Sequence, residues 1–296
     1  MANEIEGIIA AIVTPFDSDD SVDIRGFRKL VNHLIENNIH GILPAGSQGE
    51  FYALSRKERF QLMEAAVAEA NGRIFVMPNT GAISTKETLE LTRLAEKAGA
   101  DCVSVIIPFY ISPSQEELIY HYSAVCDSTD LPVFAYNNPD RTGGNFLKPE
   151  TIAKLARKYS NFNGLKDSSG DITQIAEIIR MTPPDFKVFV GKDTVIFGAL
   201  MYGAAGSIAA SANVAPGLTV DIYNSYKNGE YDKAKKYQQE LAPLRMAFSL
   251  GTFPVVVKEA LNMMGLPVGG CRLPVTPLSQ MSREILREIL VDMNLI

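Results

Sequence analysis

Short apolar runs alternate with longer stretches of mixed polarity along most of the chain. The runs are rich in Ile, Val and Ala and end at Gly, Pro or small polar residues, which is typical of strands buried on both faces of a parallel sheet. The stretches between them repeat apolar residues three and four positions apart, which predicts helices with one buried face. We therefore expect eight strands, at residues 7–13, 41–44, 74–77, 102–107, 132–136, 163–166, 186–190 and 206–209.

Capping residues mark where several of the helices begin. Ser55 is followed by Glu58, and Ser84 by Glu87, which is the three-residue spacing of a capping box. Pro149 suits the first turn of another helix, because that position needs no backbone N–H donor. The expected helices cover residues 23–37, 55 onwards, 84–98, 114 onwards, 149 onwards, 172–181 and the segment through 202, followed by 231–246, 253–264 and 278–293.

Eight consecutive strand and helix units predict an α/β fold of the (β/α)8 TIM barrel type. Residues 1–220 would form this barrel as the catalytic domain. Residues 221–296 would form a C-terminal helical extension packed on it, because no Gly-, Ser- or charge-rich linker separates the two. The alternative is a doubly wound open sheet. No Gly-x-Gly-x-x-Gly follows any predicted strand, so the barrel is favoured.

Composition and charge narrow the class of protein and of partner. The chain has 296 residues, of which 46% are hydrophobic and 21% charged, as expected of an enzyme with a large core. A net charge of −6 with dispersed acidic residues argues against a nucleic-acid partner. Residues 1–6 lack the basic start and apolar core of a signal peptide, and no apolar run reaches the roughly 20 residues of a membrane span. We expect a cytoplasmic protein with no membrane partner.

Cysteine and histidine are too sparse and scattered to suggest a metal site. The three cysteines form no Cys-x-x-Cys, and none of the three histidines is followed by a second metal ligand two or four residues later in the chain. Cys102 lies in an apolar run and is expected to be a small buried hydrophobic residue. The same scarcity argues against a Ser-His-Asp hydrolase and against a metal-dependent class II aldolase on a similar barrel.

A lysine stands at the carboxyl end of the sixth predicted strand, where the active site of such a barrel lies. The apolar run of residues 162–165 ends in Lys166 and then breaks into small polar residues. Burying an ammonium is costly, and desolvation favours the neutral amine, which attacks carbonyl carbon. The alternative is an ordinary ion pair between Lys166 and Asp167 or Asp171 in a solvated turn.

The same rim of the barrel collects polar groups from the other strand ends. The Gly-Ser-Gln-Gly turn after the second strand has backbone N–H groups that could bind an anion. Each side chain also has a purely structural explanation: a turn cap for Ser47, packing for the tyrosines, or an ion pair between Arg141 and Asp140. The candidates are Gly46, Ser47, Gln48, Tyr110, Tyr136, Arg141, Lys192 and Ile208.

Together these residue types suit carbanion chemistry on a 2-oxo acid. A lysine can form an imine, a tyrosine can move protons, and an anion-binding turn can hold a carboxylate. The protonated imine is itself the electron sink, so we expect no metal and no cofactor beyond the covalent imine on Lys166. Lys192 is the second candidate amine. A barrel that only binds a 2-oxo acid, as a sensor or transport partner, is the non-enzymatic alternative; the presence of both Lys166 and Tyr136 argues against it.

Three motifs, in matching order and spacing, resemble those of the dihydrodipicolinate synthase / N-acetylneuraminate lyase family of pyruvate-dependent class I aldolases. The similarity extends over residues 7–290, nearly the whole chain, and implies the barrel fold independently of the strand pattern. The motifs are Gly46-Ser47-Gln48-Gly49-Glu50, Tyr136-Asn137-Asn138-Pro139-x-Arg141-Thr142-Gly143 and Gly164-Leu165-Lys166-Asp167.

The resemblance implies a role for each candidate residue. Lys166 would form the Schiff base with pyruvate, and Tyr136 would donate and accept protons. Ser47 and the neighbouring Gln48 amide would hold the pyruvate carboxylate, with Gly46 in the same substrate-binding turn. Ile208 would offer its backbone carbonyl near the pyruvate. Tyr110 resembles the tyrosine that family members insert into a neighbouring subunit's site, which implies a homotetramer built as a dimer of dimers.

The resemblance leaves the second substrate open between a small aldehyde and, in the cleavage direction, a 2-keto-3-deoxy acid. Arg141 stands where the synthases bind that substrate's carboxylate, which favours 4-hydroxy-tetrahydrodipicolinate synthase-like activity on pyruvate and aspartate semialdehyde. Synthases typically have two threonines where this chain has Ser47 and Gln48. Aldolases of 2-keto-3-deoxy sugar acids vary more at this position. Cleavage of such an acid, or N-acetylneuraminate lyase-like cleavage, is therefore the alternative.

Overall fold

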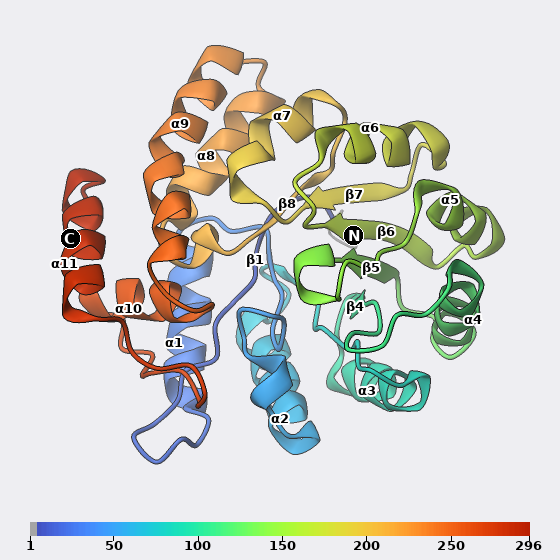
Figure 1. Cartoon of the computed structure of the whole chain (residues 1–296), viewed down its shortest axis with the longest axis horizontal. Helices are drawn as coiled ribbons and strands as arrows, with labels where there is room; N and C mark the ends of the chain where they lie inside the picture. The colour runs from blue at the N-terminus through green and yellow to red at the C-terminus, as the bar shows by residue number, and fades with distance from the viewer. Residues whose placement is uncertain (1–4) are drawn as a thin grey trace.

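Eight parallel strands form a curled sheet in the computed structural model, which describes residues 5–296 (Figure 1). β1 pairs with both β2 and β8, so the first and last strands are neighbours. The sheet closes between β3 and β4 through a parallel bridge from Asn79 to Ser104. This confirms the predicted (β/α)8 barrel. The strands are β1 Gly7–Ala10, β2 Gly41–Ile42, β3 Phe75–Val76, β4 Val103–Ile106, β5 Val133–Asn137, β6 Phe162–Asp167, β7 Lys187–Val190 and β8 Gly206–Ala209.

A layer of helices surrounds the strands, and several begin where the sequence predicted. Ser55 and Glu58 form a reciprocal capping box, Ser84 caps α3, and Pro149 opens α5. The helices are α1 Ile24–Glu36, α2 Arg56–Ala70, α3 Thr85–Ala98, α4 Gln115–Cys126, α5 Pro149–Lys158, α6 Ile172–Met181, α7 Ile196–Met201, α8 Pro216–Lys227, α9 Tyr231–Ala247, α10 Val255–Met263 and α11 Gln280–Asp292. Short 3₁₀ turns lie at η1 Phe51–Ala53, η2 Pro139–Arg141, η3 Asp193–Val195, η4 Ser211–Asn213 and η5 Phe248–Leu250.

The first strands are shorter than their apolar runs predicted. β1 ends at Ala10, although the run continues to Val13 and stays buried. Beyond Ala10 the side-chain amide of Asn213 replaces a strand partner: it accepts from Val13 N at 3.1 Å and donates to Ala11 O at 2.8 Å. Apolar patterning reports burial rather than ladder hydrogen bonds, so it overestimated the strand. The expected helices also omitted α8, which begins with Pro216 and Gly217.

Two apolar layers hold the barrel together. The larger cluster fills the space between the strands and the helices. A smaller cluster fills the barrel interior and includes Cys102, which is fully buried as predicted. The interior is packed with side chains from several strands, including Ile9, Leu43, Phe134 and Phe189. The barrel is therefore a solid support for groups at its rim.

The last three helices lie together on one side of the barrel, next to α8 and α1 (Figure 1). Residue 220, the expected end of the barrel, falls inside α8, so we propose that the extension begins at α9. No single helix within residues 5–296 is long and apolar enough to span a membrane. The segment Tyr231–Leu250 and α10 reach the required length and composition only as a pair, which is bent by 118°.

Candidate active site

A cavity of about 260 Å³ opens at the carboxyl ends of the strands. Strand ends supply its floor, and the extension supplies part of its wall through α9, η5 and Phe253, two residues before α10. It is lined by Ala11, Ser47, Gln48, Tyr136, Asn138, Asp140, Arg141, Lys166, Ser168, Gly191, Lys192, Asp193, Ile208, Ala210, Arg245, Phe248, Ser249 and Phe253. Seven candidates from five strand ends thus meet in one cavity: Ser47, Gln48, Tyr136, Arg141, Lys166, Lys192 and Ile208.

Lys166 is buried on β6 with its ammonium at the cavity floor. Its Nζ lies 4.2 Å from the centroid of the Tyr136 ring. The alternative ion pairs are wrong: Asp167 accepts from Gln174 Nε2 at 2.7 Å, and Asp171 caps α6 through Thr173 N at 2.8 Å. No described carboxylate lies within ion-pairing distance of this amine. Lys166 is therefore free to react with a ligand in the cavity.

Gly191, at the end of β7, leaves room for the lysine side chain. A Cβ atom at this position would lie 2.9 Å from Lys166 Cε and would collide with Ser168 Oγ. The backbone of the neighbouring strand therefore forms one wall of the lysine's channel. Only glycine allows this close approach without moving Lys166 or Ser168.

Tyr136 lies on β5 directly beside Lys166, because the two residues are paired in the parallel register. Its hydroxyl accepts a hydrogen bond from Asn138 Nδ2 at 2.7 Å and also interacts with the Ser47 and Ser168 side chains. Burial alone would raise the pKa of Tyr136. The Lys166 ammonium, Ser47, Ser168 and Asn138 stabilise the phenolate more strongly, so that pKa is lowered. The phenol is thus placed and tuned to exchange protons.

The turn after β2 presents one unpaired acceptor to the cavity. Gln48 is 6% exposed, and its Oε1 has no hydrogen-bond partner among the described residues. Asp193 resembles it: the residue is 1% exposed, Oδ2 accepts from Ser211 N at 2.9 Å, and Oδ1 is unpartnered within residues 5–296. Buried acceptors without a donor are rare in proteins and point to a missing ligand or water.

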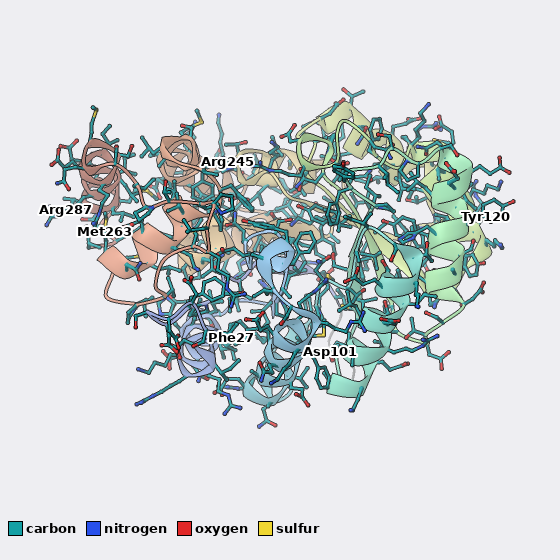
Figure 2. All side chains as sticks on the ribbon, turned by 60° about the horizontal axis from the view of Figure 1, so that its bottom comes forward. Phe27, Asp101, Tyr120, Arg245, Met263 and Arg287 are labelled. Atoms are coloured by element: carbon teal, nitrogen blue, oxygen red, sulfur yellow. The ribbon has the colours of Figure 1, made fainter. Side chains whose placement is uncertain are left out.

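Positive groups gather toward the mouth of the cavity. Lys192 pairs with Asp140 at 2.8 Å, so the predicted alternative pairing of Asp140 with Arg141 is wrong. The Arg141 guanidinium stacks on Phe253 at 5.0 Å. Arg245, labelled in Figure 2, stacks on Phe248 at 5.2 Å. Neither guanidinium has a carboxylate partner in the described part of the chain, so both remain available to an anionic ligand.

No group of three His, Cys, Asp or Glu side chains within residues 5–296 is arranged to hold a metal ion. The three cysteines are free thiols, two of them buried.

Comparison with known proteins decides the family. Residues 4–293 match the model of the dihydrodipicolinate synthetase family. The chain belongs to this family. It is 41% identical to a 4-hydroxy-tetrahydrodipicolinate synthase from Methanoculleus marisnigri, over 97% of this chain and 99% of that protein. The resemblance found in the motifs is confirmed.

Solved structures of the family share the whole fold. The dihydrodipicolinate synthase of Thermotoga maritima superposes with a TM-score of 0.96 at 35% identity, covering 99% of this chain and 100% of that one. The chloride-inhibited synthase of Acinetobacter baumannii, solved with pyruvate, has a TM-score of 0.95 at 36% identity with the same coverage. Both matches support the barrel with its C-terminal helices.

Two of the residues singled out by the family motifs do not line the cavity described above. Gly46 is buried behind the turn, where a Cβ would collide with Leu43. Tyr110 is 91% exposed, with a left-handed φ of 72°, and does not line its own chain's cavity. A role for Tyr110 in this chemistry therefore requires another protein chain.

Several other residues that line the cavity were not singled out from the sequence. Ser168 follows Lys166 closely in the chain, and its polarity could have revealed it. Arg245, Phe248 and Phe253 come from the extension, and no local pattern marks them. Their place depends on how α9 and η5 pack back over the barrel rim.

Proposed function

We propose that the protein is a class I aldolase that forms an imine between Lys166 and pyruvate. The observation that carries this proposal is a buried lysine without a carboxylate partner, beside a tyrosine at the floor of the cavity. The neutral amine adds to the C2 carbonyl carbon, and water leaves as the C=N bond forms. Loss of a C3 proton then gives the enamine, because the protonated imine accepts the electron pair of the broken C–H bond.

Tyr136 is the proton carrier in this scheme. Its lowered pKa makes the phenol a better acid and eases formation of the phenolate. Asn138, Ser47 and Ser168 orient its oxygen towards the amine. We propose that Ser47 and the turn from Gly46 to Gln48 hold the pyruvate carboxylate, with the Ile208 carbonyl beside the bound pyruvate.

The first candidate reaction is condensation of the enamine with aspartate semialdehyde, as in 4-hydroxy-tetrahydrodipicolinate synthases. The relatives that share up to 41% of their sequence with this chain support it. In this scheme the enamine C3 attacks the aldehyde carbon, and the aldehyde oxygen gains the proton that Tyr136 relays. Arg141, unpaired at the cavity mouth, suits the carboxylate of the aldehyde substrate.

The second candidate is cleavage of a 2-keto-3-deoxy sugar acid, or an N-acetylneuraminate lyase-like cleavage, each releasing pyruvate. The unpaired oxygens of Gln48 and Asp193 favour it, because each can accept a hydrogen bond from a sugar hydroxyl. Aspartate semialdehyde carries no hydroxyl group, and its ammonium is the one group that could donate to these acceptors. A site with buried acceptors discriminates strongly against a substrate that leaves them unpaired.

The imine mechanism needs no metal ion and no other cofactor, because the protonated imine itself accepts electrons.

We also propose a cytoplasmic homotetramer, a dimer of dimers, in which Tyr110 enters the cavity of a neighbouring subunit. Its exposure of 91% is unusual for a tyrosine and is consistent with such a contact. Light scattering should give a mass of four chains. A monomer with full activity would refute the role of Tyr110.

Reductive trapping tests the imine. Pyruvate with borohydride should add one reduced pyruvyl group per chain, and peptide mapping should place it on Lys166. Lys192 and Lys258 are internal controls, because both are lysines held in ion pairs. No adduct, or an adduct on either control lysine, would refute the mechanism.

A panel of aldehyde acceptors and cleavage substrates then separates the candidate reactions. Aspartate semialdehyde, glyceraldehyde, N-acetylmannosamine and 2-keto-3-deoxy acids are assayed by coupled steady-state turnover. Fast turnover of the semialdehyde alone supports the synthase, and preference for hydroxylated compounds supports the second candidate. Binding of 2-oxo acids without turnover of any acceptor would support a sensor. Loss of activity in a strong chelator would indicate a metal-dependent aldolase instead.

A further inference from the structure

A buried ion pair joins the C-terminal extension to the turn beside the active site. Lys258 Nζ on α10 lies 2.8 Å from Glu50 Oε1, and their side chains are 1% and 0% exposed. The two residues are 208 positions apart in the chain. Lys258 also donates to the carbonyl of Gly270. This lysine belongs to the extension, but the carboxylate that it pairs with is at the end of the Gly-Ser-Gln-Gly turn.

Glu50 holds the turn in a conformation that its own backbone disfavours. Its φ of 56° lies in the left-handed region, as does the φ of 51° at Ala45, on the other side of the turn. Non-glycine residues adopt this region only where their surroundings compensate for the strain. Glu50 receives such support at its second oxygen, where Arg272 N donates at 3.0 Å. Both oxygens of the carboxylate are therefore held by the extension, one by α10 and the other by the segment between α10 and α11.

Aromatic packing fixes the same pair from the barrel side. Lys258 Nζ lies 4.1 Å from the ring centroid of Phe16, and the Arg272 guanidinium carbon lies 4.5 Å from it. Phe16 follows Thr14, whose hydroxyl donates to the Gly49 carbonyl at 2.7 Å. The end of the turn is thus held at Gly49 by Thr14 and at Glu50 by Lys258. Ser47 and Gln48, which face the cavity, come directly before these two anchored residues.

We propose that Lys258 and Glu50 are positioning residues that set the turn for the carboxylate of pyruvate. The extension then determines the affinity for pyruvate, in addition to forming the wall around the second substrate. Lys258 does not touch the cavity itself, so it acts only through Glu50 and the turn. This inference rests on the proposed imine chemistry with pyruvate at Lys166.

The test measures how much pyruvate half-saturates borohydride trapping in K258M, E50Q and the double variant K258M/E50Q. Each change loosens the turn, so the half-saturating concentration should rise about tenfold, while kcat at saturating pyruvate falls less than threefold or so. Because the two residues act as one unit, the double variant should be no worse than the poorer single variant. The double variant also removes both charges together, which avoids the unpaired buried charge that could unfold K258M.

A matched control separates positioning from general stability. Arg283 pairs with Glu259 at 3.4 Å, beside Lys258 but away from the turn. R283M should leave pyruvate saturation unchanged. The inference is overturned if E50Q and the double variant, shown to be folded by circular dichroism, need a half-saturating pyruvate concentration within about twofold of that of the wild type. It is also overturned if R283M raises this concentration as much as E50Q does. Absence of a wild-type adduct on Lys166 would instead refute the proposed function, so the two failures are distinguishable.

Discussion

Tyr136 and Lys166 are register partners on adjacent parallel strands, and the lysine Nζ lies 4.2 Å from the centroid of the tyrosine ring. Side chains paired in this way point to the same face of the sheet, so β5 and β6 deliver an amine and a phenol to one point. The barrel core beneath them is filled by side chains, which fixes both strand ends. Imine formation and proton transfer can therefore occur at one rigid position.

Replacing Tyr136 by Phe should separate these two steps. The ring and its packing beside Lys166 remain, but the hydroxyl that interacts with Ser47, Ser168 and Asn138 is lost. We expect kcat to fall by about 100- to 10,000-fold, the usual contribution of a positioned acid or base. Borohydride trapping at long incubation should still give the adduct on Lys166. If Y136F turns over within tenfold or so of the wild type, another group carries the proton.

The position of this pair could be predicted from the sequence because its signals are local. Lys166 and Tyr136 each end an apolar run, and the carboxyl ends of parallel strands meet on one rim. The family motifs then assigned roles to them. Strand lengths were less predictable, because the Asn213 side chain replaces strand partners near Val13, and apolar patterning does not register such a bond.

The wall of the cavity could not be predicted from local patterns. Arg245 lies in α9 and Phe253 follows η5, and the packing of α9 against α8 brings them over the rim. The same is true of Lys258, which meets Glu50 across 208 positions. Gly191 is a further case, since its close approach to Lys166 depends on the register of β6 and β7.

Gly191→Ala should slow imine formation. The added methyl group would lie 2.9 Å from Lys166 Cε and would collide with Ser168 Oγ, so the amine must shift away from its attack position. A displacement of about 1 Å can cost roughly a hundredfold in rate, which rapid-quench trapping with pyruvate would detect. Gly198→Ala is the matched control, because a Cβ there meets only Ile172 at 3.9 Å. Equal rates for G191A and the wild type would show that the lysine does not use this channel.

Arg141→Ala should weaken use of the aldehyde substrate and leave imine formation with pyruvate unchanged. Its guanidinium lies at the cavity mouth without a carboxylate partner among the described residues. Losing a charge-assisted hydrogen bond costs about 1.5–3 kcal/mol, so KM for a carboxylate-bearing aldehyde should rise roughly 10- to 100-fold. Half-saturation of trapping by pyruvate should not change.

Two comparison variants sharpen this result. Arg245→Ala tests whether the second guanidinium at the cavity mouth also binds the carboxylate of the aldehyde substrate. Arg157→Ala is a surface control on α5 and should behave like the wild type. If R141A weakens imine formation with pyruvate as much as it weakens binding of the aldehyde substrate, Arg141 contributes to pyruvate binding or to the fold, not specifically to the aldehyde.

His121 should make the protein less stable as the pH falls below neutral. The residue is 4% exposed on α4, its Nδ1 bonds Thr85 Oγ1 at 2.9 Å, and burial lowers its pKa from 6.5 to about 4. The folded state keeps this histidine neutral, whereas the unfolded chain takes up a proton below pH 6.5. Stability is therefore lost as the pH falls from about 6.5 towards 4, by about 2 kcal/mol between pH 7 and pH 5.

His121→Gln tests this prediction, because glutamine can keep a hydrogen bond to Thr85 but cannot titrate. Urea unfolding of both proteins should be measured at pH 7, 6 and 5. Other groups, such as His40, also have a lowered pKa, but they contribute equally to both proteins and cancel in the difference. The variant's free energy of unfolding should fall less with acidification than that of the wild type, by about 2 kcal/mol. Parallel pH profiles would mean that His121 is protonated in the folded state at pH 5, which its burial against Thr85 and Tyr122 opposes.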